Sequence, residues 1–201
     1  PLNPVGYGNS PYQPYSSCAG DDIYISLDTL AEEGLLKKSP MLFLEKCKKV
    51  DYERVRQYRE PYLRAAFMAF VEQKGYEKPE YKEFAAQSWV YEYGVFRALK
   101  KANNGACWNE WPEEDRTWPE NRHVLDTEVE AEARYQMFLQ YIFYTQWMKV
   151  KKAANEAGIQ IILSMWDRTL WMCGAERIIS FWTQMDVRFL LQGYHRIISA
   201  Q

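Results

Sequence analysis

Apolar residues recur at helical spacing over most of this chain. Between residues 51 and 75 they follow the i, i+3, i+4, i+7 pattern of a single helix face, at Leu63, Ala66, Phe67, Phe70 and Val71. A second helix is predicted from Pro79 to Lys101, and Asn103-Asn104-Gly105 would end it. Its broad buried face would hold Phe84, Ala85, Trp89, Tyr93, Phe96 and Leu99.

The longest helix is predicted from about Asn121 to Ala157, and it carries two apolar stripes side by side. One stripe consists of Val124, Ala131, Tyr135, Phe138 and Ile142. The other consists of Leu139, Phe143, Trp147, Val150 and Ala154. So wide an apolar face predicts burial against two partners. Gly158 would cap the helix, and Ile159 to Ile162 would form a buried parallel strand.

The N-terminal stretch has a different pattern. Residues 3–20 contain three prolines and three glycines, which exclude a helix there. Residues 22–28 alternate briefly and predict a short extended segment. Asp28 or Thr29 would then cap a short helical turn through Glu33, which Gly34 would end.

The loop at residues 3–20 also holds the first candidate chemistry. It displays Tyr7, Tyr12 and Tyr15 among small polar residues. Flat aromatic faces beside short hydrogen-bonding side chains suit a sugar-binding cleft, because an aromatic ring packs on the apolar face of a pyranose. A structural loop whose tyrosines cover the edge of the core is the alternative, and residue chemistry alone favours it.

Composition narrows the class of protein. The chain has 201 residues, 47% hydrophobic and 26% charged, which is ordinary for a globular domain. Its net charge of −2 makes no electrostatic case for binding nucleic acid or an anionic membrane surface. No apolar run approaches the ~18 residues that a membrane span requires. We therefore expect neither nucleic acid nor a membrane as a partner.

The cysteines and histidines argue against a metal site. Cys18, Cys47, Cys107 and Cys173 are widely spaced and form no C-x-x-C pair, and the chain has 2 histidines. We expect no metal and no cofactor. Scattered cysteines without a secretion signal are typical of a reducing compartment, so a cytoplasmic location is expected.

The wording of the loop resembles a known family. The run Gly6-Tyr7-Gly8-Asn9-Ser10-Pro11-Tyr12-Gln13, followed by Ser16-Ser17-x-Ala19-Gly20, is similar to the signature loop of the amylomaltases. These are the 4-α-glucanotransferases of the α-amylase-like clan. Further landmarks follow in the family's order over about residues 1–162: Val50-Asp51-Tyr52, residues 91–100, Trp108-Asn109-Glu110-Trp111-Pro112, Phe138-x-Gln140 to Gln146-Trp147, and residues 153–162. The two tryptophans of Trp108 to Pro112 are interpreted as structural, packed inward at a rigid turn.

The resemblance implies an α/β fold, namely a fragment of a (β/α)8 TIM barrel dominated by a helical insertion. Residues 1–50 would supply the barrel loop and a short extended segment, and residues 51–120 the helical insertion. Residues 121–162 would supply the long helix and the following barrel strand. The chain starts at Pro1 without an initiator methionine, which we interpret as a start inside a longer sequence.

Residues 163–201 carry none of the family's wording. Where the family continues the strand with Gly, Asp and Pro, this chain has Leu163-Ser164-Met165-Trp166. We interpret this tail as translation out of frame. When the codons that could encode residues 190–200 are read in a shifted frame, permitted choices spell the family motif V-A-G-V-P-P-D-Y-F-S. Sequencing the coding DNA would test this interpretation.

The resemblance also implies an activity. Amylomaltases transfer α-1,4-glucan segments between glucans by a retaining mechanism, which uses a carboxylate nucleophile and a second carboxyl group as acid and base. Both groups belong to later strands of the family, so we assign no catalytic residue. The acidic runs Glu113-Glu114-Asp115 and Glu128/Glu130/Glu132 are expected on a turn and on a helix surface. The implied ligands are α-1,4-glucans and maltooligosaccharides.

Three residues are candidate glucan ligands by their match to the family. Ser10 and Tyr12 match positions that line the donor cleft, and Tyr7 matches a position beside it. Cys18 stands where the family prefers Phe, and Asp21-Asp22 replace Asn-Pro. The chain by itself is expected to be inactive. A non-catalytic helical protein that binds glucan or another partner, and has kept the loop, is the alternative.

Overall fold

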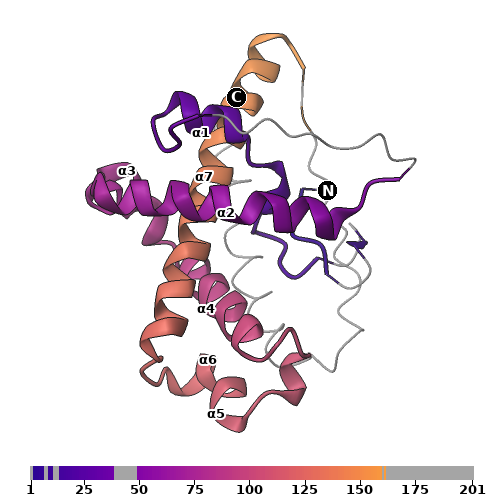
Figure 1. The fold of residues 1–201 in the computed structure, drawn as a ribbon, viewed down its shortest axis with the longest axis vertical. Coiled ribbons are helices and arrows are strands. Elements are labelled where there is room, and N and C mark those ends of the chain that lie inside the picture. The colour runs from indigo at the N-terminus through magenta and orange to yellow at the C-terminus, as the bar shows by residue number, and fades with distance from the viewer. Residues whose placement is uncertain (1, 7–8, 11–13, 39–48, 160, 162–201) are drawn as a thin grey trace, which may run out of the picture.

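The computed structural model describes residues 2–6, 9–10, 14–38, 49–159 and 161, which form a mostly helical fold (Figure 1). In chain order the helical elements are η2 (Asp22–Tyr24), α1 (Leu27–Glu32), α2 (Tyr52–Glu72), η3 (Gly75–Glu77), α3 (Pro79–Ala85), α4 (Ser88–Ala102), η4 (Trp108–Glu110), α5 (Glu113–Arg116), α6 (Trp118–Asn121) and α7 (Thr127–Glu156). The helical character expected of residues 51–120 is present. No barrel strand lies among the described residues, and the strand expected at Ile159 to Ile162 includes two residues outside them.

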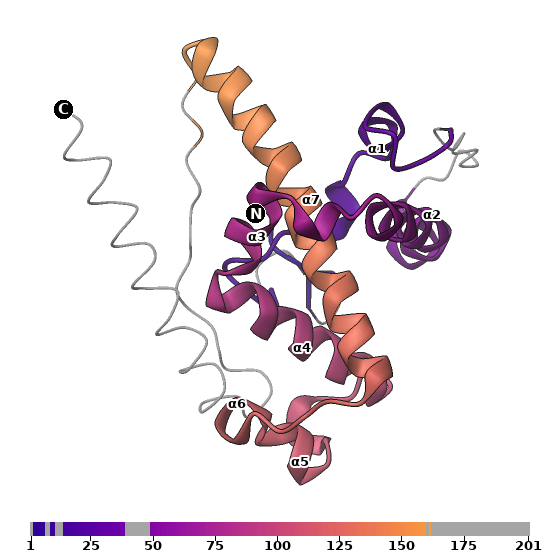
Figure 2. The same ribbon diagram turned by 90° about the vertical axis from the view of Figure 1, so that its left-hand side faces the viewer.

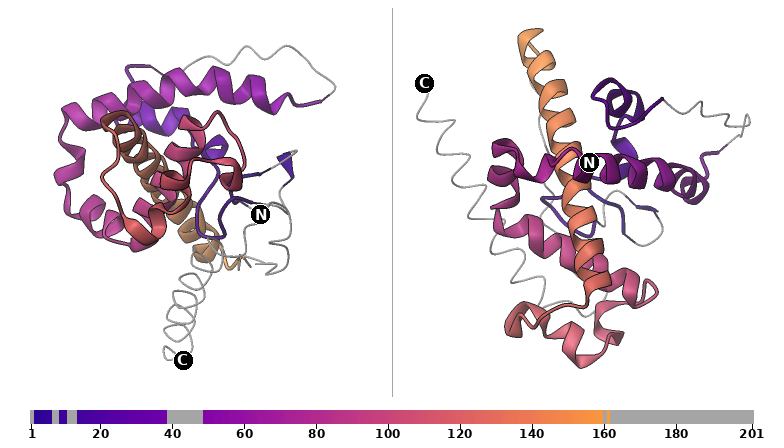
Figure 3. Two further views of the ribbon diagram at one scale, coloured as in Figure 1. Left: turned by 90° about the horizontal axis from the view of Figure 1, so that it is seen from below. Right: turned by 60° about the vertical axis from the view of Figure 1, so that its left-hand side comes forward.

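Helix α7 is the axis of the fold. In Figures 1 and 2 it runs the length of the structure, and its C-terminal end extends beyond the other described elements. Seen from below, α2 passes along one side of α7 and the N-terminal loop lies beside it (Figure 3). Helix α4 packs along the N-terminal half of α7. Helix α7 therefore contacts both α4 and the segment at the end of the N-terminal loop.

The first core lies where α1 and α2 meet α7. Phe138 of α7 is fully buried, and its ring centroid lies 5.0 Å from that of Phe70 on α2. The cluster of buried residues is Ile25, Leu27, Leu30, Leu35, Leu36, Leu63, Ala66, Phe70, Tyr81, Tyr135, Phe138, Leu139 and Ile142. Most of the apolar stripe predicted on α2 thus faces this core, although Val71 at its end is 39% exposed.

The second core lies between α4, α7 and the tryptophan turn. Trp111 and Trp118 are buried against Val95, Ala98, Leu99 and Ala133, and Trp108 packs on them from the edge. Trp111 Nε1 donates to the carbonyl of Ala106 at 3.0 Å. Both rings of the predicted turn therefore serve packing.

Helix α4 approaches α7 closely at Gly94. A Cβ atom built on Gly94 would lie 2.7 Å from the carbonyl oxygen of Ala133, which is closer than a carbon atom can pack. Glycine is therefore the residue that allows these two helix backbones to meet.

Local signals placed the C-terminal ends of α1, α4 and α7 correctly. Asp51 caps α2 by accepting from the N–H of Arg54 at 3.0 Å. Gly34 and Gly158 take positive φ angles of 74° and 75° after α1 and α7. Asn104 and Gly105 do the same after α4.

Two predictions about elements were wrong. The helix predicted from Pro79 to Lys101 is two helices, interrupted at Ala86 and Gln87. Helix α3 packs on α7 and contacts α2 through the ring pair Tyr81–Phe70, while α4 packs along α7. Residues 22–24 form a 3₁₀ turn instead of an extended segment. The cap of α1 is Ser26, which accepts from the N–H of Thr29 at 3.2 Å, and Asp28 lies within the helix.

The stripes predicted on α7 were also too long. The helix begins at Thr127, so Val124 precedes it and is 94% exposed. Ala131 is exposed as well, and Val150 is 56% exposed because the C-terminal part of α7 projects from the fold. Burial is confirmed in the middle of the helix, at Tyr135, Phe138, Leu139 and Ile142.

Candidate functional site

The N-terminal loop is closed at its base by backbone hydrogen bonds. Val5 and Pro14 form an isolated antiparallel bridge, and the Tyr15 N–H donates to Pro4 O at 2.9 Å. The Asp21 N–H donates to Leu2 O at 2.8 Å. Residues 2 and 21 are therefore adjacent, and the described base of the loop is closed.

A side chain inside the loop strengthens this base. Asn3 Nδ2 donates to the carbonyls of Ser17 at 2.7 Å and Ala19 at 3.1 Å. Ser16 Oγ accepts from the N–H groups of Cys18 and Ala19, both at 3.2 Å. These short polar residues thus satisfy backbone groups of the loop, which is the structural use of turn residues.

The structure describes one of the three candidate ligands. Ser10 is half-buried in the loop. Tyr7 and Tyr12 lie outside the described residues, so their position relative to Ser10 stays a prediction.

Tyr15 forms the described aromatic surface of the loop. It is 39% exposed, and its ring centroid lies 6.1 Å from that of Phe96 on α4. Lys100 Nζ lies 5.1 Å from the Tyr15 centroid and the Arg97 guanidinium 5.9 Å from it. The loop therefore rests on α4 through one aromatic contact and two cations.

Asp21 ties the end of the loop to its beginning and to α2. Its carboxylate is almost fully buried, and Oδ2 accepts from the Val5 N–H at 3.2 Å while Oδ1 accepts from the Ile23 N–H at 3.0 Å. Arg56 donates both Nη atoms to it at 2.8 Å. Burial opposes ionisation, but the hydrogen bonds from Arg56 outweigh it and lower the pKa of Asp21 to about 2.

Asp22 also bonds Arg56, but its pKa is shifted in the opposite direction. Its Oδ1 accepts from Arg56 Nη1 at 2.6 Å. Burial raises the pKa of Asp22, and the neighbouring Asp21 adds to this, while the positive charge of Arg97 opposes it. Asp21 is therefore the member of the pair that is firmly ionised.

Arg59 fills a backbone role beside these carboxylates. It is 8% exposed and donates through Nη2 to the carbonyl of Ile25, and to that of Asp22 at 3.3 Å. Burial lowers the pKa of the Arg59 guanidinium, and the negative charge of Asp22 opposes the shift. The arginine thus satisfies two carbonyls, one at the first residue of η2 and one just after its last residue.

Two glutamines of α7 bind the segment that follows the loop. Gln140 Oε1 accepts from the Gly20 N–H at 2.8 Å, and its Nε2 donates to Gly20 O at 3.0 Å. Gln146 makes the same two bonds to Ser26, at 2.7 and 3.2 Å. Each glutamine side chain thus bonds both the N–H and the carbonyl of one residue, as a residue on a neighbouring β-strand would. Gln140 and Gln146 belong to the sequence landmark Phe138-x-Gln140 to Gln146-Trp147. The residue types of this landmark do not by themselves indicate that the two side chains bind a backbone segment.

Sequence reasoning missed Arg56 as part of the site. Asp21 and Asp22 were noticed as departures from the family's wording, but nothing near Arg56 marks it as their partner 35 residues away. A signal was available in hindsight, because two adjacent acidic residues where the family has Asn-Pro require a compensating cation when buried.

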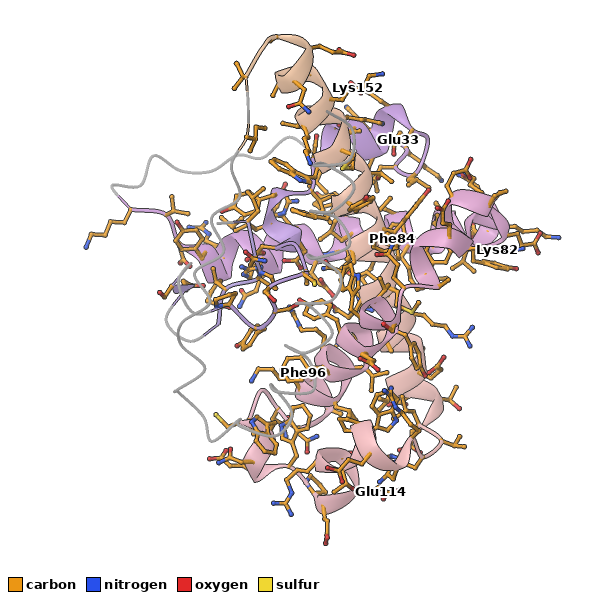
Figure 4. The ribbon with its side chains drawn as sticks, turned by 180° about the vertical axis from the view of Figure 1, so that it is seen from behind. Glu33, Lys82, Phe84, Phe96, Glu114 and Lys152 are labelled. Atoms are coloured by element: carbon orange, nitrogen blue, oxygen red, sulfur yellow. The ribbon has the colours of Figure 1, made fainter. Side chains whose placement is uncertain are left out.

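The acidic runs are engaged in structure. Glu114 is exposed at the end of the molecule opposite Glu33 and Lys152 (Figure 4), and Asp115 accepts from Asn103 Nδ2 at 2.8 Å. Glu130 accepts from the Tyr91 hydroxyl at 2.8 Å. In the described part of the chain, no group of three metal-binding side chains is close enough to hold a metal ion, and no helix is long and apolar enough to cross a membrane.

Known proteins match this chain over most of its length. A family model described as 4-alpha-glucanotransferase matches residues 1–168. The 4-alpha-glucanotransferase of Synechocystis is 37% identical over 177 residues, 80% of this chain and 33% of the relative. That of Thermus thermophilus is 36% identical over 174 residues, 82% of this chain and 33% of the relative.

A solved structure supports the same assignment. The amylomaltase from Streptococcus agalactiae in complex with acarbose superposes with a TM-score of 0.71 at 28% identity, covering 80% of this chain and 34% of that one. The chain thus spans about a third of the length of the relatives it matches. On the family match over residues 1–168 and the similarity to these relatives, the chain belongs to the 4-alpha-glucanotransferase family.

Proposed function

We propose that this chain is part of an amylomaltase, an enzyme that transfers α-1,4-glucan segments between glucans and maltooligosaccharides with retention of configuration. The observation that carries the proposal is the family match over residues 1–168, which includes the loop at residues 3–20. In the whole enzyme this loop would form one wall of the donor cleft, and the helices after it an insertion in a (β/α)8 barrel. The division into residues 1–50, 51–120 and 121–162 belongs to this proposal.

Three side chains are proposed to meet the glucan. The Ser10 hydroxyl would bond a sugar hydroxyl, and the Tyr12 ring would stack on a pyranose beside the reactive bond. Tyr7 would hold glucan next to the main cleft. The closed base of the loop supports these roles, because a fixed loop loses little conformational freedom when it binds.

The chain is proposed to bind glucan without turning it over, since both catalytic carboxylates belong to later strands of the family. The alternative of a non-catalytic helical protein is not favoured, because the relatives reported above are named as transferases. A cytoplasmic location, and the absence of nucleic-acid and membrane partners, stay predictions.

Two assays on the 201-residue chain test the proposal. Incubated with maltotriose, the chain should release no glucose, and release would overturn the claim that the catalytic groups lie elsewhere. In calorimetric titration with maltoheptaose, Tyr12→Ala should weaken binding by about tenfold, roughly 1.4 kcal/mol. Tyr76→Ala, at an exposed tyrosine of η3, is the matched control and should leave affinity unchanged. A wild-type chain that does not bind maltoheptaose would contradict the role of the loop.

The tail at residues 163–201 lies outside the described residues. Its origin by translation out of frame is a separate proposal, supported by the family motif that the shifted codons permit. Sequencing the coding DNA tests it, and a shifted frame that lacks this motif would refute it.

A further inference from the structure

We propose that Gln140 is a positioning residue for the glucan-binding loop, and that it holds the loop base in its ligand-competent place from the middle of α7. The inference rests on the proposed function of the loop. It gives a role to the landmark glutamine, whose side chain bonds the N–H and the carbonyl of Gly20.

The contact itself is fully buried. Gln140 is 3% exposed. Its Oε1 accepts from the Gly20 N–H, and its Nε2 donates to the Gly20 carbonyl oxygen. Water cannot replace either bond without entering the core, so the geometry of Gly20 follows that of α7. Phe143, one helical turn further along, fills the space where a side chain on Gly20 would be, with ring carbons 2.1 Å from the site of a Cβ. These contacts therefore fix the position of Gly20 relative to α7.

Gly20 in turn determines where the loop lies. The next residue, Asp21, donates its N–H to Leu2 O and accepts from the Val5 N–H. A shift of Gly20 would thus move both ends of the loop, including the bridge between Val5 and Pro14. Ser10 lies within the span that these bonds close. Because a binding group works only when its supporting contacts hold it in place, loss of the Gln140 clamp should weaken ligand binding.

Gln146 provides an internal control. It makes the same pair of hydrogen bonds, but to Ser26, which lies beyond η2 and caps α1. Ser26 has no described hydrogen bond to residues 2–20. Removing either glutamine should weaken the fold, whereas removing Gln140 alone should disturb the loop.

The experiment compares Gln140→Met, Gln140→Glu and Gln146→Met in the 201-residue chain. Maltoheptaose affinity is measured by calorimetry, and amide hydrogen exchange at Val5 and Tyr15 by NMR. Gln140→Met should weaken affinity by about tenfold and speed exchange at both amides by a similar factor. Gln140→Glu keeps the acceptor for the Gly20 N–H and should lie between Gln140→Met and the wild type. Gln146→Met should change both readouts by less than about twofold, although its melting temperature also falls.

Several outcomes would overturn the inference. Wild-type affinity and exchange in Gln140→Met would do so, as would equal losses in Gln140→Met and Gln146→Met. If Gln140→Met fails to fold, the comparison of Gln140→Glu with Gln146→Met decides in the same way. A wild-type chain that does not bind maltoheptaose would contradict the proposed function, and amide exchange would still decide whether Gln140 positions the loop.

Discussion

Asp21 and Arg56 form a two-pronged ion pair between the loop and α2, with Oδ1 to Nη1 and Oδ2 to Nη2 both at 2.8 Å. The carboxylate is 2% exposed and the guanidinium 26% exposed. Parallel N–H bonds to one carboxylate fix the orientation of both groups as well as their distance. The pair therefore joins the end of the loop to α2, which begins at Tyr52.

Removal of the cation should be costly. Arg56→Met leaves the Asp21 carboxylate buried without its partner and should lower the free energy of unfolding by about 3–5 kcal/mol, measured by urea denaturation. The double variant Asp21→Asn/Arg56→Met removes the charge as well and should recover most of that loss. A loss in Arg56→Met of the same size as in the double variant would show that the unpaired charge is not the cause.

Acid should weaken the same contact. The pKa of Asp21 is lowered from 3.8 to about 2, so its stabilising contribution is present above pH 3.8 and is lost as the pH falls through about 2. Relative to Asp21→Asn, the wild type should lose about 2 kcal/mol of unfolding free energy between about pH 5 and about pH 2. Asp22 has a raised pKa and thus the opposite slope, but it is present in both proteins and largely cancels. A difference that stays constant over this range would contradict the prediction.

Gly94→Ala should destabilise the chain although alanine favours helices. In an exposed helix interior this change stabilises by about 1 kcal/mol. Here the new methyl group would meet the Ala133 carbonyl at 2.7 Å and force α4 away from α7. We expect a net loss of about 1–3 kcal/mol in urea denaturation. A gain in stability would show that the two helices separate without cost.

Arg64 and Lys101 should contribute unequally to the contact that they share. Both donate to Glu132 Oε2 on α7, from α2 at 2.6 Å and from α4 at 2.7 Å. Arg64 also bonds Glu60 at 2.7 Å and lies 3.4 Å above the ring of Tyr135, whereas Lys101 is 63% exposed. Arg64→Met should therefore cost about 2 kcal/mol and Lys101→Met less than about 1 kcal/mol. Equal losses would mean that the contacts with Glu60 and Tyr135 add nothing.

Features that depend on neighbouring residues were predictable from the chain. The apolar spacing around Phe67 located α2, and the Asn103-Asn104-Gly105 run located the end of α4. The order of landmarks also identified the family and the loop. These signals succeed because helix periodicity and helix caps involve residues within about four positions of each other.

Contacts between distant residues were decided in three dimensions. The interruption at Ala86 and Gln87 contains neither glycine nor proline, and it lies where the chain passes from α3 to α4, which packs along α7. The exposure of Val150 depends on where α7 leaves the core, which its apolar pattern does not contain. The clamp of Gln140 on Gly20 joins residues 120 positions apart. Burial and hydrogen-bond partners are properties of the packed molecule. The residue type determines which bonds a side chain can make, and only the tertiary fold determines its partners.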